Sequence, residues 1–133
     1  MDKELLSKVT FFLNNFIKCA EQGLVEYRDL KPKTTNFLRS IGWTYKAMEN
    51  HILNNIKPEN YFRGPTKHHH RKECTVMEFG MILEDADSLS LFKLYVKLEL
   101  IVSNDSLIAG YMSFHPREQE IEHFPLDEKN EVI

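Results

Sequence analysis

The sequence predicts an α+β domain in which two N-terminal helices pack on a three- to four-stranded antiparallel sheet. Two patterns support this fold class: apolar residues recur every three or four positions in the first part of the chain, and they alternate with polar residues later on. The 133 residues fit one hydrophobic core. We therefore expect a single domain with a helical part (1–56), a basic loop (57–72), an antiparallel sheet (73–126) and a tail (127–133).

The first helix is predicted from Asp2 to about Gln22. Asp2 can cap its N-terminus, and Gly23 is a suitable stop. One face of this helix has a stripe of apolar side chains. Such stripes usually pack in a protein core and are seldom functional sites, so we interpret this stripe as core. The apolar residues at helical spacing are Leu5, Leu6, Val9, Phe12, Leu13, Phe16 and Ile17.

The second helix is predicted from Thr34 or Thr35 to about Ile56, because either threonine can cap it and Pro58 closes it. Gly42 lies inside this helix, where glycine costs about 1 kcal/mol relative to alanine. We also interpret its apolar stripe as core. The stripe consists of Phe37, Leu38, Ile41, Tyr45, Met48, Ile52 and Ile56.

Three strands rich in Val, Ile, Phe and Tyr are predicted over 75–83, 91–102 and 107–115. The turn composition of 103–106 joins the last two as a hairpin. A short edge strand near 121–124 is a further expectation. If the apolar faces pack against the helices, alternation leaves a polar set on the opposite face: Tyr95, Lys97, Glu99, Tyr111, Ser113 and His115.

The composition argues against membrane and secreted proteins. No apolar run approaches the ~20 residues that span a bilayer, and the N-terminus lacks the features of a secretory signal. The two cysteines are too few for a disulfide framework. The simplest interpretation is a cytoplasmic protein with no membrane partner. The chain has a net charge of −3, with basic residues concentrated in its middle and acidic residues toward its C-terminus.

The basic segment combines aromatic and cationic side chains. Tyr61 and Phe62 could stack nucleobases, while Arg63, Lys67 and Arg71 could neutralise phosphates. The alternative interpretation is a buried corner between helix and strand with a charged rim. Neither interpretation is excluded by the sequence.

A metal site is not expected. His68, His69 and His70 are adjacent, whereas zinc ligands usually come in pairs separated by two to five residues. Cys74 is the nearest further ligand candidate. The sequence also lacks a phosphate-binding glycine loop, a nucleophile elbow and an HExxH motif. We therefore expect no cofactor.

The second half of the chain resembles the MqsR-type toxins, which are RelE-like ribonucleases of bacterial toxin–antitoxin systems. The resemblance implies a RelE-like fold, metal-independent cleavage of messenger RNA and neutralisation by a cognate antitoxin. It rests on the order of five short motifs: Tyr61-Phe62-Arg63-Gly64-Pro65, Met77-Glu78-Phe79-Gly80, Tyr95-Val96-Lys97-Leu98, Ser113-Phe114-His115 and Phe124-Pro125.

The resemblance also implies site residues. The family's aromatic–basic pair falls on Phe62 and Arg63, where arginine replaces the usual lysine. Glu78 stands where glutamine is usual, and the family's strand tyrosine and lysine fall on Tyr95 and Lys97.

Chemistry alone adds His115 to this set. Cleavage of RNA without a metal needs a base, an acid and cations at the phosphate, and histidine side chains ordinarily titrate near neutrality. The candidate catalytic residues are Arg63, Glu78, Tyr95, Lys97 and His115, and the candidate RNA contacts are Tyr61, Phe62, Lys67 and Arg71. Two alternatives remain: a non-enzymatic regulator that binds one protein partner, and an immunity-type protein with an acidic tail.

Overall fold

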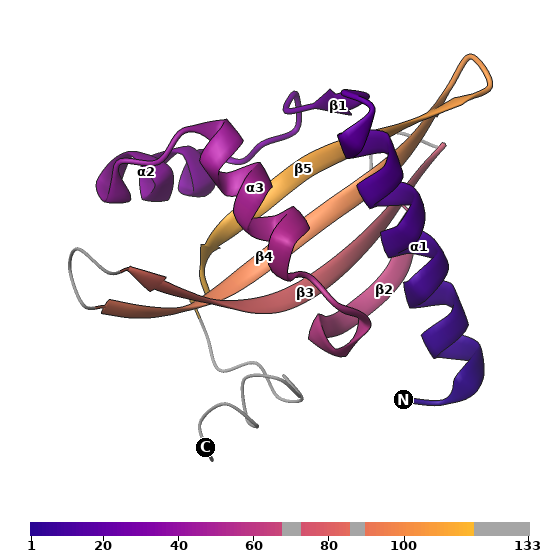
Figure 1. Ribbon diagram of the computed structural model, residues 1–133, viewed down its shortest axis with the longest axis horizontal. Helices are drawn as coiled ribbons and strands as arrows, with labels where there is room; N and C mark the ends of the chain where they lie inside the picture. Colours follow the sequence, from indigo (N-terminus) through magenta and orange to yellow (C-terminus); the bar gives the residue numbers. More distant parts are fainter. Residues whose placement is uncertain (68–72, 86–89, 119–133) are drawn as a thin grey trace.

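The computed structural model describes residues 1–67, 73–85 and 90–118, and these form an α+β fold (Figure 1). Within them the chain makes three α-helices, one short 3-10 helix and five strands. In chain order these are α1 (Lys3–Glu21), β1 (Val25–Glu26), α2 (Pro32–Ile41), α3 (Tyr45–Asn55), η1 (Pro58–Asn60), β2 (Tyr61–Lys67), β3 (Cys74–Asp85), β4 (Ser90–Ser103) and β5 (Ser106–Pro116).

The five strands form one sheet in the order β1-β5-β4-β3-β2. The neighbours among β2 to β5 are antiparallel as predicted, but β1 pairs with β5 in parallel. The sheet is therefore mixed, and the prediction of a purely antiparallel sheet is wrong at this edge. A strand of two residues is too short to show the alternation by which strands are predicted. It forms because the chain leaves α1 beside the edge of β5, where Val25 pairs with Ala109.

The predicted second helix is two helices. Gly42 adopts a left-handed conformation, with φ of 71°, and ends α2. Thr44 then caps α3 by accepting a hydrogen bond from the backbone N–H of Ala47 at 3.1 Å. The apolar spacing continues across this break, which explains why the pattern alone suggested one helix.

The first part of the predicted basic loop is strand β2. Gly64 has a φ of 115°, and a Cβ atom on it would lie 2.9 Å from the backbone oxygen of Val76, so only glycine fits this close approach. Register shifts on both sides of Arg63 make the strand irregular. Such bulges obscure the alternation by which strands are recognised. Arg71 and His68–His70 lie outside the described residues, as do the predicted strand near 121–124 and the tail.

The helices cover one face of the sheet, and the main core lies between them (Figure 1). The predicted alternation in β4 is confirmed, since Leu94, Val96 and Leu98 are fully buried in this core. The helical stripes are mostly core, with Val9 and Phe16 of α1 completely buried, but the prediction is wrong at Leu6 and Tyr45, which are 44% and 43% exposed. No described helix is long and apolar enough to cross a membrane.

One predicted face in β5 is wrong. Tyr111 was expected beside Ser113 and His115, but it is buried against the helices, where its ring meets Phe16 edge-on at 5.2 Å. The reason is a register shift: Lys97 pairs with Ser113, but Leu98 pairs with Tyr111, which leaves Met112 as an extra residue. A bulge of one residue reverses the faces on its two sides.

Candidate functional site

The predicted catalytic residues lie together on the sheet face opposite the described helices, which we call the helix-free face. Arg63 on β2, Glu78 on β3 and Lys97 on β4 pair directly across the strands, and Lys97 pairs in turn with Ser113 on β5. Two residues further along β4, Tyr95 pairs with His115. The sheet register thus brings five side chains from four strands into one cluster, comprising Arg63, Glu78, Tyr95, Lys97 and His115.

Glu78 is at the centre of this cluster and is nearly buried. Its two carboxylate oxygens accept hydrogen bonds from Nε and Nη2 of Arg63, both at 2.8 Å. Oε1 also accepts a hydrogen bond from the Tyr95 hydroxyl. The Arg63 side chain is 62% exposed and that of Glu78 only 7%, so the pair joins a solvent-facing cation to an inward-facing anion.

The charges of the cluster are coupled. Burial alone would raise the pKa of Glu78, but the hydrogen bonds from Arg63 and Tyr95 and the charges of Arg63 and Lys97 lower it below its ordinary value. Burial and the hydrogen bond to Glu78 raise the pKa of the Tyr95 phenol. The pKa of Arg63 is raised mainly by its hydrogen bond to Glu78. At neutral pH the cluster therefore contains a carboxylate, a neutral phenol and a guanidinium.

His115 lies on the other side of Tyr95 from Glu78. The Tyr95 and His115 rings are 5.6 Å apart between centroids. Nδ1 of His115 lies 2.9 Å from the backbone oxygen of Pro116. Because a carbonyl only accepts hydrogen bonds, Nδ1 donates in this contact, and Nε2 is the ring nitrogen left for other partners.

Three of the predicted RNA contacts, Tyr61, Phe62 and Lys67, lie on β2, but they do not all point toward the cluster. Phe62 lies beneath the Arg63 guanidinium, 5.0 Å from its ring centroid, and Lys67 is exposed at the end of the strand. Tyr61 instead packs against the main core, and its hydroxyl donates a hydrogen bond to the backbone oxygen of Gly64 at 2.6 Å. Burial raises the pKa of this phenol, with Glu78 as a smaller cause. Tyr61 is thus poorly placed to stack a base.

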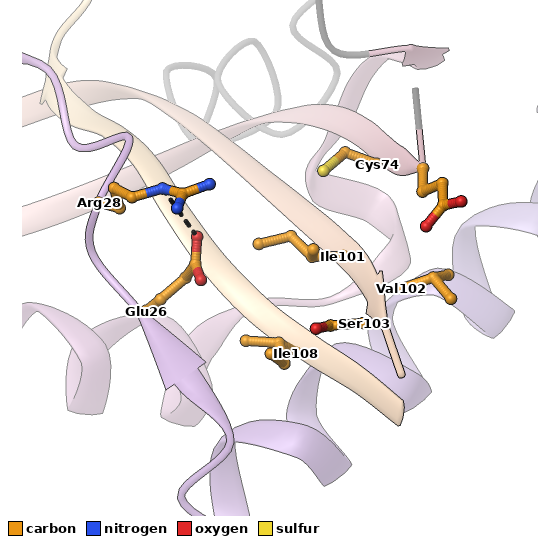
Figure 2. A pocket seen from close by; sticks show the side chains of 8 residues that line it. Glu26, Arg28, Cys74, Ile101, Val102, Ser103 and Ile108 are labelled. Carbon is orange, nitrogen blue, oxygen red and sulfur yellow. Dashed lines mark ion pairs between the residues drawn. The ribbon is translucent and has the colours of Figure 1, made fainter. Parts of the chain in front are cut away.

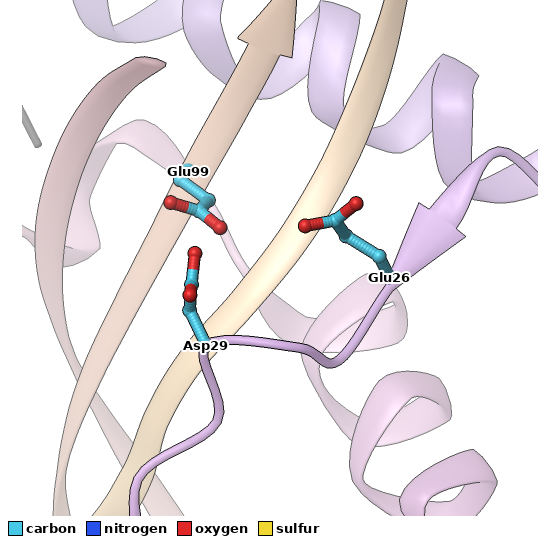
Figure 3. A group of neighbouring side chains, drawn as sticks. All are labelled: Glu26, Asp29 and Glu99. Carbon is cyan, nitrogen blue, oxygen red and sulfur yellow. The ribbon is translucent and has the colours of Figure 1, made fainter. Parts of the chain in front are cut away.

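A second group on the helix-free face was missed in the sequence. Glu26 and Asp29, near β1, and Glu99 on β4 direct their carboxylates toward one another (Figure 3). One oxygen from each lies within 4.8 Å of the others, a spacing at which carboxylates could hold a divalent cation. No motif could have revealed this group, because the parallel pairing of β1 with β5 is what brings Glu26 and Asp29 to Glu99.

A pocket of about 400 Å³ lies beside this acidic group (Figure 2). An ion pair of 4.0 Å joins Arg28 and Glu26 at the pocket. Its other lining residues are mostly apolar or neutral, and include Cys74, Ile101 and Ile108. The pocket contains none of the predicted catalytic residues, so it is distinct from the Glu78 cluster.

Comparison with known proteins identified no relative of this chain. No protein-family model matches it, and neither the curated proteins nor the solved structures contain a significant match.

Proposed function

We propose that this protein is the toxin of a bacterial toxin–antitoxin pair and cleaves messenger RNA as a metal-independent endoribonuclease. The observation that carries the proposal is the Glu78 cluster, which combines a carboxylate, an imidazole and two cations on one sheet face. Cleavage of a ribose–phosphate chain needs these groups: a base, an acid and positive charge at the phosphate. The MqsR-like order of motifs supports the same conclusion.

In the proposed reaction Glu78 is the base. Its carboxylate removes the proton of a ribose 2′-hydroxyl while that oxygen attacks the adjacent phosphorus. The bond from phosphorus to the 5′-oxygen breaks, and Nε2 of protonated His115 donates a proton to the leaving oxygen. The products are one RNA end with a 2′,3′-cyclic phosphate and another with a 5′-hydroxyl. One proton is taken up and one is released, so the protein returns to its starting charge after proton exchange.

The cations bind the phosphate as charge develops on it. Arg63 can present its planar fork to two phosphate oxygens, and Lys97 adds a positive charge beside Glu78. Phe62 packs against the Arg63 guanidinium and is half-buried. It is therefore better placed than Tyr61 to contact a base. Lys67 extends the positive edge along β2, and Arg71 is proposed as a further contact.

The test is cleavage by variants that leave the fold intact. His115→Ala should lower the rate of RNA cleavage by about 10²–10⁴-fold, as expected for loss of a general acid. It should also relieve growth inhibition in bacteria that express the chain. Lys97→Ala should behave alike, whereas Lys8→Ala on the exposed side of α1 removes the same charge and should change neither readout.

Three results would contradict the proposal. If the purified protein cleaves no RNA and does not inhibit growth, the ribonuclease assignment is wrong. If it cleaves RNA but the His115 and Lys97 variants match the parent, the cluster is not the active site. Cleavage that persists after exhaustive chelation is expected, and its loss would contradict a metal-independent mechanism.

A non-enzymatic interaction protein is the second candidate. Its support is that Arg63, the most exposed charge of the cluster, is already neutralised by Glu78. Under this alternative the Arg63–Glu78 pair stabilises the pairing of β2 with β3. The protein then does not cleave RNA, with or without substitutions in the cluster. Co-expression with the product of an adjacent gene separates the candidates, because only a toxin needs a cognate antitoxin to permit growth.

A further inference from the structure

Glu78 makes the contacts that a phosphate group would make in this site. The Arg63 fork binds both of its oxygens at 2.8 Å, the Tyr95 hydroxyl donates to one of them, and Lys97 pairs with it across the strands. A fork of two parallel N–H donors is the arrangement by which arginine recognises carboxylates and phosphates alike. The cradle formed by Arg63, Tyr95 and Lys97 is thus an anion site with a carboxylate of the protein in it.

We propose that Glu78 is an internal anion that occupies the phosphate position, and that an incoming phosphodiester takes over Arg63 and so releases Glu78 to act as the base. The proposal rests on the function proposed above, and it adds that Glu78 occupies the anion site until substrate binds. Its ligand is the oxyanion of a phosphodiester.

The exposures of the two partners support this exchange. Arg63 is 62% exposed, so a ligand from solvent can reach its guanidinium, while Glu78, at 7%, faces inward. Arg63 has five N–H donors and uses two of them on Glu78. A phosphate can therefore bind Arg63 first and displace the carboxylate afterwards. The Phe62 ring, 5.0 Å from the guanidinium carbon, supports Arg63 in both arrangements.

The exchange has an electrostatic consequence. The groups that face Glu78 are Arg63 and Tyr61 from β2, and Tyr95 and Lys97 from β4; His115 of β5 reaches it only through Tyr95. Hydrogen bonds from Arg63 and Tyr95 hold the pKa of Glu78 below its ordinary value. Loss of the Arg63 contact raises that pKa, and a carboxylate with a higher pKa is a stronger base. Substrate binding and activation of the base would then be one event.

The first experiment measures the affinity for sulfate by calorimetry, because sulfate is a phosphate-like anion whose charge is constant near neutral pH. Glu78→Gln removes the competing charge and nearly keeps the shape, so it should bind sulfate about tenfold more tightly than the parent, the factor expected for one charged hydrogen bond. Glu84→Gln is the matched control, because Glu84 is an exposed glutamate on the same strand. It should bind as the parent does, and Arg63→Ala should lose the site.

The second experiment uses the parent protein and does not depend on the stability of any variant. The carboxyl carbon of Glu78 is followed by NMR over a pH titration, with and without saturating sulfate. Bound sulfate should shift the midpoint to higher pH. The proposal is overturned if the midpoint does not move, or if Glu78→Gln and Glu84→Gln bind sulfate equally.

These results are separable from the proposed function. A protein that shows the sulfate effects but cleaves no RNA retains the anion exchange and loses the ribonuclease assignment. Conversely, a protein that cleaves RNA through His115 without either sulfate effect is a ribonuclease in which Glu78 and phosphate do not compete.

Discussion

On each side of the sheet a nearly buried glutamate accepts a hydrogen bond from a tyrosine, yet the two pairs differ in their surroundings. Under the helices, the Tyr27 hydroxyl donates to Glu49 at 2.6 Å, and Tyr27 stacks on the buried Tyr111. On the helix-free face, Tyr95 donates to Glu78 and lies beside His115.

Their cations differ as well. Glu49 is approached by Lys46 at 3.9 Å, whereas Arg63 binds Glu78 through two hydrogen bonds. The first pair has aromatic neighbours, and the second has a titratable imidazole and a solvent-facing guanidinium. The surroundings of a Glu–Tyr pair therefore decide whether it only stabilises the fold or can also take part in a reaction.

The largest effect is expected in the helix-covered core. Phe16→Ala removes a fully buried ring that contacts Tyr111 and Phe12, and should lower the free energy of unfolding by about 3–5 kcal/mol. Phe11→Ala on the same helix is the control, because Phe11 is 70% exposed and its loss should cost less than about 0.5 kcal/mol. Denaturant titration measures both. Equal losses would mean that α1 does not pack as described.

The two tyrosines should separate stability from activity. Tyr27→Phe leaves buried Glu49 without its donor and should cost about 1–3 kcal/mol of stability. RNA cleavage per folded molecule should not change. Tyr95→Phe should lower cleavage, because the Tyr95 hydroxyl belongs to the cradle of Arg63, Tyr95 and Lys97 that is proposed to bind the phosphate. If Tyr27→Phe impairs cleavage as much as Tyr95→Phe does, the two faces are not functionally distinct.

The helix-covered face should respond to mild acid through His51. Burial lowers the pKa of His51, partly offset by its contact with the backbone oxygen of Ile82 at 3.2 Å. The unfolded chain then takes up a proton first, so stability is complete above the unfolded pKa of about 6.5 and is lost as pH falls below it. His51→Gln should remove this part of the pH dependence in unfolding experiments. An unchanged slope would contradict a buried, neutral His51.

On the helix-free face, the contribution of Glu78 should respond at lower pH. The pKa of Glu78 is lowered in the folded protein, so its contribution is present above the unfolded value of about 4.3 and is lost as pH falls through the folded value. Between neutrality and mild acid, the stability difference between the parent and Glu78→Gln should stay constant, and it should shrink in stronger acid. A difference that already shrinks near neutrality would show that Arg63 and Tyr95 do not stabilise the charged form.

Residue spacing alone predicts the parts of this protein in which one repeating pattern continues without a break. The stripe of α1, the alternation of β4 and the hairpin turn at Asn104 and Asp105 all follow from residue spacing and turn preference. These features are local: a helix face or a strand face is set by the period of the backbone, whatever its neighbours are. The same spacing also placed Tyr95, Lys97 and His115 on one face correctly.

The alignment of separate segments, in contrast, depends on tertiary contacts. The bulge at Met112 placed Tyr111 in the core, the left-handed Gly42 divided a helix, and the register of β2 placed Arg63 opposite Glu78. The pairing of β1 with β5 likewise brought Glu26 and Asp29 to Glu99. Each depends on a break in periodicity or on a contact between residues distant in the chain. A pattern along one segment does not by itself set register, because register also depends on the turns and on the face that each partner strand buries.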